Sequence, residues 1–219
     1  MSQNKCFIDF DGTINDYSER MFQFFNQNVP VEYSHTLTKN EFWQLKRMGI
    51  HEVNWLNEKF EINISVEEWN KKKIELIETE KYLSFDKLFP FSIQALTKLR
   101  TKYKLVLVTK RSSELNLLHQ LSLYKIKSFF DDVSIIHHDK KKETAVRGKY
   151  VTSADDVFIG DTEDDIEAGI SLGIETYFVL SGIRDLWISK KYKNLNIFDN
   201  ILKVAKVAVN YRVDGLFGA

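Results

Sequence analysis

The chain of 219 residues is long enough for one large domain or for a core with a smaller inserted domain. Lysine and arginine number 31, as do aspartate and glutamate, so the formal net charge is zero and neither nucleic acid nor an anionic membrane is indicated as a partner. The single cysteine cannot form an internal disulfide, no apolar run approaches the ~20 residues of a membrane span, and the first residues lack a signal-peptide pattern. We therefore expect a soluble cytoplasmic protein.

The first predicted element is an apolar strand and turn at residues 5–13, in which Asp9 and Asp11 flank Phe10 and a glycine follows. Side chains alternate along an extended segment, so the two carboxylates point the same way. Adjacent carboxylates repel each other unless a cation lies between them or one of them holds a proton. The motif therefore indicates a Mg²⁺-assisted site with an aspartate nucleophile. The alternative is a solvated turn rich in Asp and Gly.

The following segment, from about residue 16 to residue 85, has helical periodicity, no convincing strand and three of the four tryptophans. Capping boxes at residues 38–41 and 65–68 predict the starts of two helices. We interpret residues 16–85 as an inserted helical domain and residues 1–15 and 86–219 as the core domain. The aromatic side chains of the insert are expected to form a small core of their own.

The rest of the chain alternates between apolar runs and helical patterns. Buried parallel strands are predicted at residues 104–109, 132–136, 156–160 and 175–180. Helices are predicted at residues 91–103, 114–123, 143–150 and 164–172, with a last amphipathic helix at 201–209. This alternation predicts an α/β fold with a doubly wound (Rossmann-like) parallel sheet and helices on both faces.

Ligand sites in such sheets lie at the carboxyl ends of the strands, and polar residues recur there. They are Asp9 and Asp11 after the first strand, Thr109 at the end of the second, Lys142 after the third, and Asp161 to Asp165 after the fourth. Acids, a hydroxyl and an amine at the ends of four strands, all at one edge of the sheet, indicate a functional site more than a set of unrelated surface residues.

These motifs resemble those of the haloacid dehalogenase-like (HAD) phosphohydrolase superfamily. The helical insert is similar to the cap of its phosphoglycolate phosphatase and β-phosphoglucomutase branch, and the resemblance covers nearly the whole chain. It implies a Mg²⁺-dependent phosphatase that hydrolyses a small phosphorylated metabolite through an aspartyl-phosphate, as a monomer or homodimer. A sugar phosphomutase of the β-phosphoglucomutase type is the alternative.

By position, the resemblance implies that Asp9 is the nucleophile, and that Asp11 protonates the leaving alcohol and then activates water. Mg²⁺ would be held by Asp9, the backbone carbonyl of Asp11 and Asp161, with Asp165 as the final acid of the fourth motif. Thr109 and a lysine would hold phosphoryl oxygens. Because Asp11 is present, a phosphate ester is favoured over a halide or a phosphonate.

Three lysines in a row, Lys140, Lys141 and Lys142, could supply that amine. We favour Lys142, which stands one turn before Val146 at the start of the next helix, where the family usually places its lysine.

Substrate choice in capped members depends on residues that the cap lowers onto the site. Lys46 or Arg47 could therefore contact an anionic or polar leaving group, although both could equally complement the dipole at a helix C-terminus. Lys110 and Arg111 follow Thr109 and would add positive charge near the phosphate. We hypothesise that they favour substrates with a second anionic group.

Overall fold

The computed structural model describes residues 3–210. Residues 1–2 and 211–219 lie outside the described residues, and with them the short end of the chain that follows the last predicted helix.

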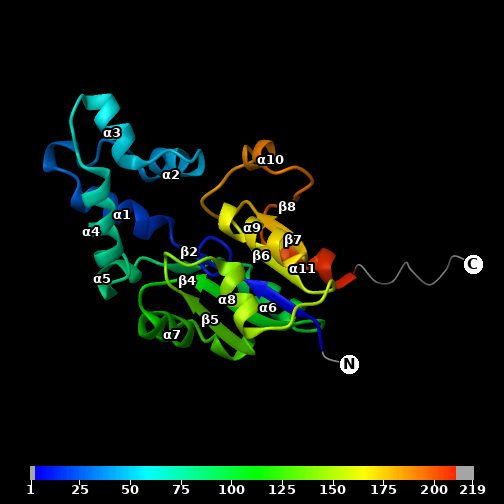
Figure 1. Cartoon of the computed structure of the whole chain (residues 1–219). Helices are drawn as coiled ribbons and strands as arrows, with labels where there is room; N and C mark the ends of the chain where they lie inside the picture. Colours follow the sequence, from blue (N-terminus) through cyan, green and yellow to red (C-terminus); the bar gives the residue numbers. More distant parts are fainter. Residues whose placement is uncertain (1–2, 211–219) are drawn as a thin grey trace, which may run out of the picture.

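The core is a six-stranded sheet of parallel strands in the order β5-β4-β1-β6-β7-β8 (Figure 1). Its strands are β1 (Lys5–Ile8), β4 (Lys104–Lys110), β5 (Asp132–Ile136), β6 (Val157–Gly160), β7 (Glu175–Val179) and β8 (Asn196–Phe198). The predicted α/β class and parallel sheet are confirmed. Strand β8 was not predicted, because three residues are too short a run to show a period.

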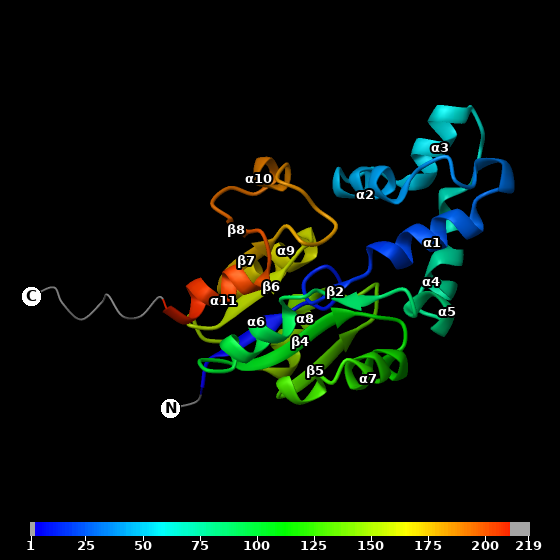
Figure 2. The same ribbon diagram turned by 180° about the vertical axis from the view of Figure 1, so that it is seen from behind.

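Helices cover both faces of this sheet (Figures 1 and 2). They are α6 (Ser92–Leu99), α7 (Glu114–Leu123), α8 (Lys142–Lys149), α9 (Glu163–Leu172), α10 (Ile188–Lys191) and α11 (Ile201–Asn210), with a 3-10 turn at Lys127–Phe129. Successive side chains of β1 point to opposite faces of the sheet. Cys6 and Ile8 belong to the apolar cluster that includes residues of α6, α7 and α11, whereas Phe7 packs with residues of α8 and α9 on the other face. Because all of these strand residues are fully buried, the end of β1 has a fixed position.

Five helices precede β3 and form a separate group, here called the helical unit: α1 (Ser18–Asn28), α2 (Lys39–Arg47), α3 (Glu52–Phe60), α4 (Val66–Leu76) and α5 (Glu80–Leu83), with a 3-10 turn at Val31–Tyr33. Their apolar side chains form a cluster of their own that includes Phe25, Phe42 and Trp69, as expected for the aromatic residues of the insert. The predicted capping box of α2 is present, with Thr38 Oγ1 accepting from the Glu41 N–H and the Glu41 carboxylate from the Thr38 N–H.

A short antiparallel ribbon connects the helical unit to the sheet. It pairs β2 (Asn15–Asp16) with β3 (Lys87–Leu88). The segment by which the chain leaves the core and the segment by which it returns therefore lie side by side. The boundaries expected at residues 15/16 and 85/86 lie in or beside this ribbon, and the division into two domains stays a prediction. Within residues 3–210, no helix has the length and apolar character needed to cross a bilayer.

Candidate active site

Asp9 directly follows β1 in the middle of the sheet, and its carboxylate meets Lys142 at the start of α8. Lys142 Nζ lies 2.7 Å from Asp9 Oδ1 and 2.6 Å from Asp165 Oδ1. The lysine side chain is only 3% exposed, so these ion pairs are shielded from water. Burial alone would lower the pKa of Lys142, but Asp165 and Asp9 raise it well above its usual value, and the amine is charged. Lys140 and Lys141 are exposed and pair with neighbouring acids instead.

Three buried carboxylates gather around this point. Asp9, Asp161 and Asp165 each offer an oxygen, and these oxygens all lie within 4.8 Å of one another. Burial first, and then its neighbours Asp9 and Asp165, raise the pKa of Asp161 well above the usual range. Burial likewise raises the pKa of Asp9 to about 6, although Lys142 opposes the rise.

The donor set fits a small hard cation. Asp161 is fully buried, and among the described residues its Oδ1 has no hydrogen-bond partner. An orphaned carboxylate oxygen facing two more carboxylates is costly unless a cation neutralises it. Asp165 has a second task, because its Oδ2 accepts from both the Thr162 N–H and hydroxyl at the start of α9. Oxygen ligands of this kind are those that Mg²⁺ takes in proteins.

The other oxygen of Asp161 is fixed by two loops. Asp161 Oδ2 accepts a hydrogen bond of 2.8 Å from the Ile183 backbone N–H. Glycines stand on both sides of the carboxylate: a Cβ on Gly12 would lie 2.3 Å from Oδ2, and one on Gly182 would lie 1.8 Å from it. Gly12 also has a positive φ of 80°, which glycine adopts without strain. The turn after Asp11 and the loop after β7 thus form a cradle for this one side chain.

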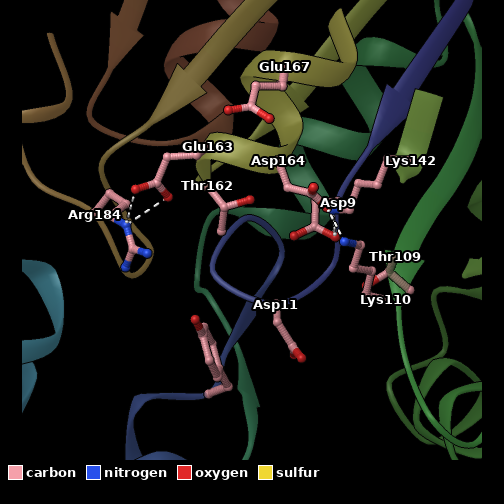
Figure 3. A pocket seen from close by; sticks show the side chains of 11 residues that line it. Asp9, Asp11, Thr109, Lys110, Lys142, Thr162, Glu163, Asp164, Glu167 and Arg184 are labelled. Atoms are coloured by element: carbon pink, nitrogen blue, oxygen red, sulfur yellow. Dashed lines mark hydrogen bonds and ion pairs between the residues drawn. The ribbon is translucent and has the colours of Figure 1, made fainter. Parts of the chain in front are cut away.

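Asp11 belongs to a different network. Its carboxylate pairs with Arg111 at 2.8 Å, with Arg20 of α1 at 2.6 Å, and accepts from the Asn15 amide at 2.8 Å. Burial alone would raise the pKa of Asp11, but Arg111 and Arg20 lower it below the usual value. Figure 3 shows the Asp11 side chain directed away from Asp9. Asp11 is therefore held ionised, apart from the three clustered carboxylates.

A cavity of about 480 Å³ opens in front of Asp9 (Figure 3). Its lining includes Thr109, Lys110 and Lys142 on one side and Glu163 and Arg184 on the other. Its volume is that of a pocket for a small molecule. Lys110 pairs with Asp164 at 2.7 Å on the cavity wall, whereas Arg111 is buried beside Asp11 and is not part of the lining.

Two residues expected to contact substrate lie elsewhere. Lys46 is buried within the helical unit, where its Nζ lies 2.5 Å from Glu52 Oε2. Arg47 extends to the loop after β7 and donates to the Leu180 and Gly182 carbonyls. Neither side chain lines the cavity in front of Asp9.

Arg20 and Asp86 were not among the predicted site residues, and they complete the surroundings of Asp11. Arg20 Nε lies 3.2 Å from Asp86 Oδ1, and Asp86 Oδ2 accepts from Asn15 and Gln120. One signal could have identified Arg20, because a cation in the first turn of a helix opposes the helix dipole. An arginine at such a position is expected to pair with an acidic residue from another part of the chain.

Known proteins share the sequence pattern and the fold of this chain. Residues 7–179 match the haloacid dehalogenase-like hydrolase family. No curated protein matches the chain. Among solved structures, a protein from Clostridium difficile described as a phosphatase has a TM-score of 0.72 at 16% identity, covering 95% of this chain and 99% of its own.

Two further solved structures are similar over their whole length. One, described as a predicted phosphoglycolate phosphatase from Haemophilus somnus, has a TM-score of 0.68 at 19% identity and covers 94% of this chain and 99% of its own. The other is described as a HAD-hydrolase from Bacillus subtilis bound to magnesium, with a TM-score of 0.62 at 15% identity and coverage of 96% and 100%. At such identities the likeness concerns the fold, whereas the family match spans most of the sequence. The chain belongs to the haloacid dehalogenase-like hydrolase family.

Proposed function

We propose that the chain is a Mg²⁺-dependent phosphatase that hydrolyses a small phosphorylated metabolite through a phosphoaspartate at Asp9. The observation that carries the proposal is the position of Asp9 beside Lys142 and two more buried carboxylates, at the floor of a 480 Å³ cavity. The solved structures described as phosphatases, and the one bound to magnesium, support the same chemistry.

Asp9 is the group that would attack phosphorus. Lys142 contacts one of its oxygens and fixes its orientation, so the other is left for the reaction. Thr109, which is buried at the end of β4 and lines the cavity, would donate to a phosphoryl oxygen, and Lys142 would contribute positive charge. Bound Mg²⁺, held by Asp9, Asp161 and Asp165 with the Asp11 carbonyl, would neutralise charge on the phosphoryl group.

Asp11 would exchange protons with the leaving group and with water. As an ionised carboxylate it is suited to activate water. To protonate the leaving group, its side chain has to leave Arg20 and Arg111, which lower its pKa, take up a proton from solvent and rotate toward Asp9, because it is now directed away (Figure 3). Since Arg20 belongs to α1, a movement of the helical unit would bring about this change. We therefore propose that residues 16–85 act as a cap.

The cavity indicates the kind of substrate. It holds fixed charges of both signs, among them Lys110 paired with Asp164 and Arg184 paired with Glu163 at 2.8 Å. A polar metabolite that displaces water from these pairs would find both hydrogen-bond donors and acceptors. Of Lys110 and Arg111, Lys110 is the one placed to meet a second anionic group, because it lines the cavity whereas Arg111 is buried beside Asp11.

The test is phosphate release from a panel of phosphorylated metabolites, with and without Mg²⁺, by wild type, Asp9→Asn and Asp139→Asn. Asp139 is an exposed loop aspartate and serves as the matched control. We expect Mg²⁺-dependent release, lowered about a thousandfold or more by Asp9→Asn and unchanged by Asp139→Asn. Release by Asp9→Asn at the wild-type rate would contradict the proposal. A requirement for a sugar bisphosphate would instead indicate the phosphomutase alternative.

A further inference from the structure

Arg47, the last residue of α2, binds the backbone of the loop after β7 in the core. Its Nη1 donates to the Leu180 carbonyl at 2.6 Å and to the Gly182 carbonyl at 3.2 Å, and its Nη2 lies 3.5 Å from Asp185 Oδ1. In return, Trp187 Nε1 donates to the Arg47 carbonyl at 2.6 Å. The helical unit and the core are therefore joined at a point far in sequence from the β2–β3 ribbon.

The same loop also holds a carboxylate of the acidic cluster. Ser181 Oγ donates to the Gly12 carbonyl at 2.7 Å, and the Ile183 N–H donates to Asp161 Oδ2 at 2.8 Å. Between them, Gly182 lies so close to Asp161 that a Cβ there would overlap its carboxylate. Three successive loop residues thus contact either Asp161 or the turn that faces it.

The two sets of contacts alternate along the loop. Arg47 binds the carbonyls of residues 180 and 182, and the groups that fix the cradle come from residues 181 and 183. Residues 180–187 contain neither helix nor strand, although the Leu180 N–H donates to the Phe198 carbonyl. The bonds to Arg47 add contacts from the helical unit to this segment. A displacement of the loop away from Arg47 would move the Ile183 N–H, and the orientation of Asp161 with it.

We propose that Arg47 is a positioning residue, which couples the docking of the helical unit on the core to the orientation of Asp161 and so to metal affinity. This inference rests on the proposed function, because it takes the acidic cluster as a Mg²⁺ site. It gives Arg47 a role different from the substrate contact expected from the sequence. By linkage, metal binding and docking of the helical unit favour each other to the same extent.

The residue type suits this role. A guanidinium presents several N–H groups in a rigid plane and can bind two carbonyls at once, whereas the lysine ammonium is a single flexible point charge. Arg47→Lys should therefore lose most of the coupling although it keeps the charge. Trp187→Phe, which removes the indole donor but keeps an aromatic ring, should weaken the same contact from the other side.

The test measures Mg²⁺ binding to the metal-free full-length protein by calorimetry, and Mn²⁺ binding by electron paramagnetic resonance, both without substrate. We expect Arg47→Ala to weaken both about five- to tenfold, which is less than the 10–100-fold typical for removing a direct partner of a metal ligand. Lys39→Ala is the matched control, because Lys39 lies on the same helix and pairs with Glu19 inside the helical unit. Its metal affinity should equal that of wild type.

Hydrogen exchange gives a second readout that does not depend on catalysis. Arg47→Ala should speed exchange of the Ile183 amide, and Mg²⁺ should slow exchange at residues 47–50 in wild type but not in Arg47→Ala. Unchanged metal affinity in Arg47→Ala, or equal losses in Arg47→Ala and Lys39→Ala, would overturn the inference alone. A wild-type protein that binds neither metal would contradict the proposed function as well.

Discussion

The Arg20 guanidinium bridges two carboxylates that flank the helical unit in the sequence, one before α1 and one after α5. Its Nη2 lies 2.6 Å from Asp11 Oδ2, in the turn after β1, and its Nε lies 3.2 Å from Asp86 Oδ1, just before β3. The arginine side chain is 3% exposed and that of Asp86 is fully buried. One residue of α1 thus forms ion pairs with both segments that connect the helical unit to the core.

Arg20→Leu should be strongly destabilising, because it leaves the buried charge of Asp86 without its cation and Asp11 with Arg111 alone. We expect the free energy of unfolding to fall by about 3 kcal/mol or more, measured by urea denaturation at neutral pH. Arg100→Leu is the control, since Arg100 is exposed and donates to the Ser128 carbonyl, and it should cost about 1 kcal/mol or less. Equal losses in the two variants would contradict the assigned role of Arg20.

Metal affinity should depend on pH. In the metal-free protein burial raises the pKa of Asp9 to about 6, so below that pH a proton occupies a carboxylate that the cation needs. Mg²⁺ affinity, measured by calorimetry from pH 5 to pH 8, should fall as the pH drops through about 6. Asp9→Asn should bind more weakly and show a flatter profile. An affinity independent of pH over this range would be inconsistent with three clustered carboxylates as ligands.

Two glycine substitutions distinguish a specific effect on the Asp161 cradle from a general effect on folding. A Cβ on Gly182 would lie 1.8 Å from Asp161 Oδ2, so Gly182→Ala should displace the carboxylate and abolish measurable Mg²⁺ binding. A Cβ on Gly148, in the last turn of α8, would meet nothing within 4 Å. Gly148→Ala should keep the metal affinity and stabilise the protein by about 0.5–1 kcal/mol. Wild-type metal affinity in Gly182→Ala would exclude the close approach described here.

The helical unit contains an ion cluster whose contribution depends on pH. Burial alone would raise the pKa of Glu52, but Lys46 and Lys73 hold it well below its usual range, and Trp69 Nε1 donates to it at 2.9 Å. A carboxylate with a lowered folded-state pKa stabilises the fold above its unfolded pKa and loses that effect as the pH falls toward the folded one. At neutral pH, Glu52→Gln should therefore cost about 3 kcal/mol.

The gap in unfolding free energy between wild type and Glu52→Gln should stay constant above about pH 5 and narrow below about pH 4. Urea denaturation of both proteins across this range measures it. Glu58→Gln, on the same helix, is the control and should show no such gap. A gap that widens on acidification would reverse the sign derived for Glu52.

The parts that sequence predicted well share one property: local pattern determines them. Strands such as β4 are continuous apolar runs, and the acids that follow β1 and β6 have to meet at the edge of a parallel sheet. Lys142 was favoured over its two neighbours because it stands at the start of the next helix, where the resembled family usually places its lysine. The structure brings this lysine to Asp9 and leaves the other two exposed.

The parts that sequence could not predict depend on contacts between distant segments. Nothing near Arg47 in the chain indicates that it would bind the carbonyls of a loop more than a hundred residues away. Every residue has a backbone carbonyl, so no residue type identifies the partner. The pairing of Arg20 with Asp11 and Asp86 likewise depends on how α1 leaves the β2–β3 ribbon. Both arginines bind across the junction between the helical unit and the core.

If Asp9 is the nucleophile, it carries the phosphoryl group during turnover, and that phosphoaspartate can be trapped chemically. Wild-type protein turning over a phosphate ester with Mg²⁺ is quenched in acid and treated with borohydride, which reduces an acyl phosphate to an alcohol, and residue 9 is then identified by peptide mass spectrometry. We expect homoserine at position 9, dependent on substrate and on Mg²⁺. Steady turnover with Asp9 unmodified and the reduced residue at another position would contradict it.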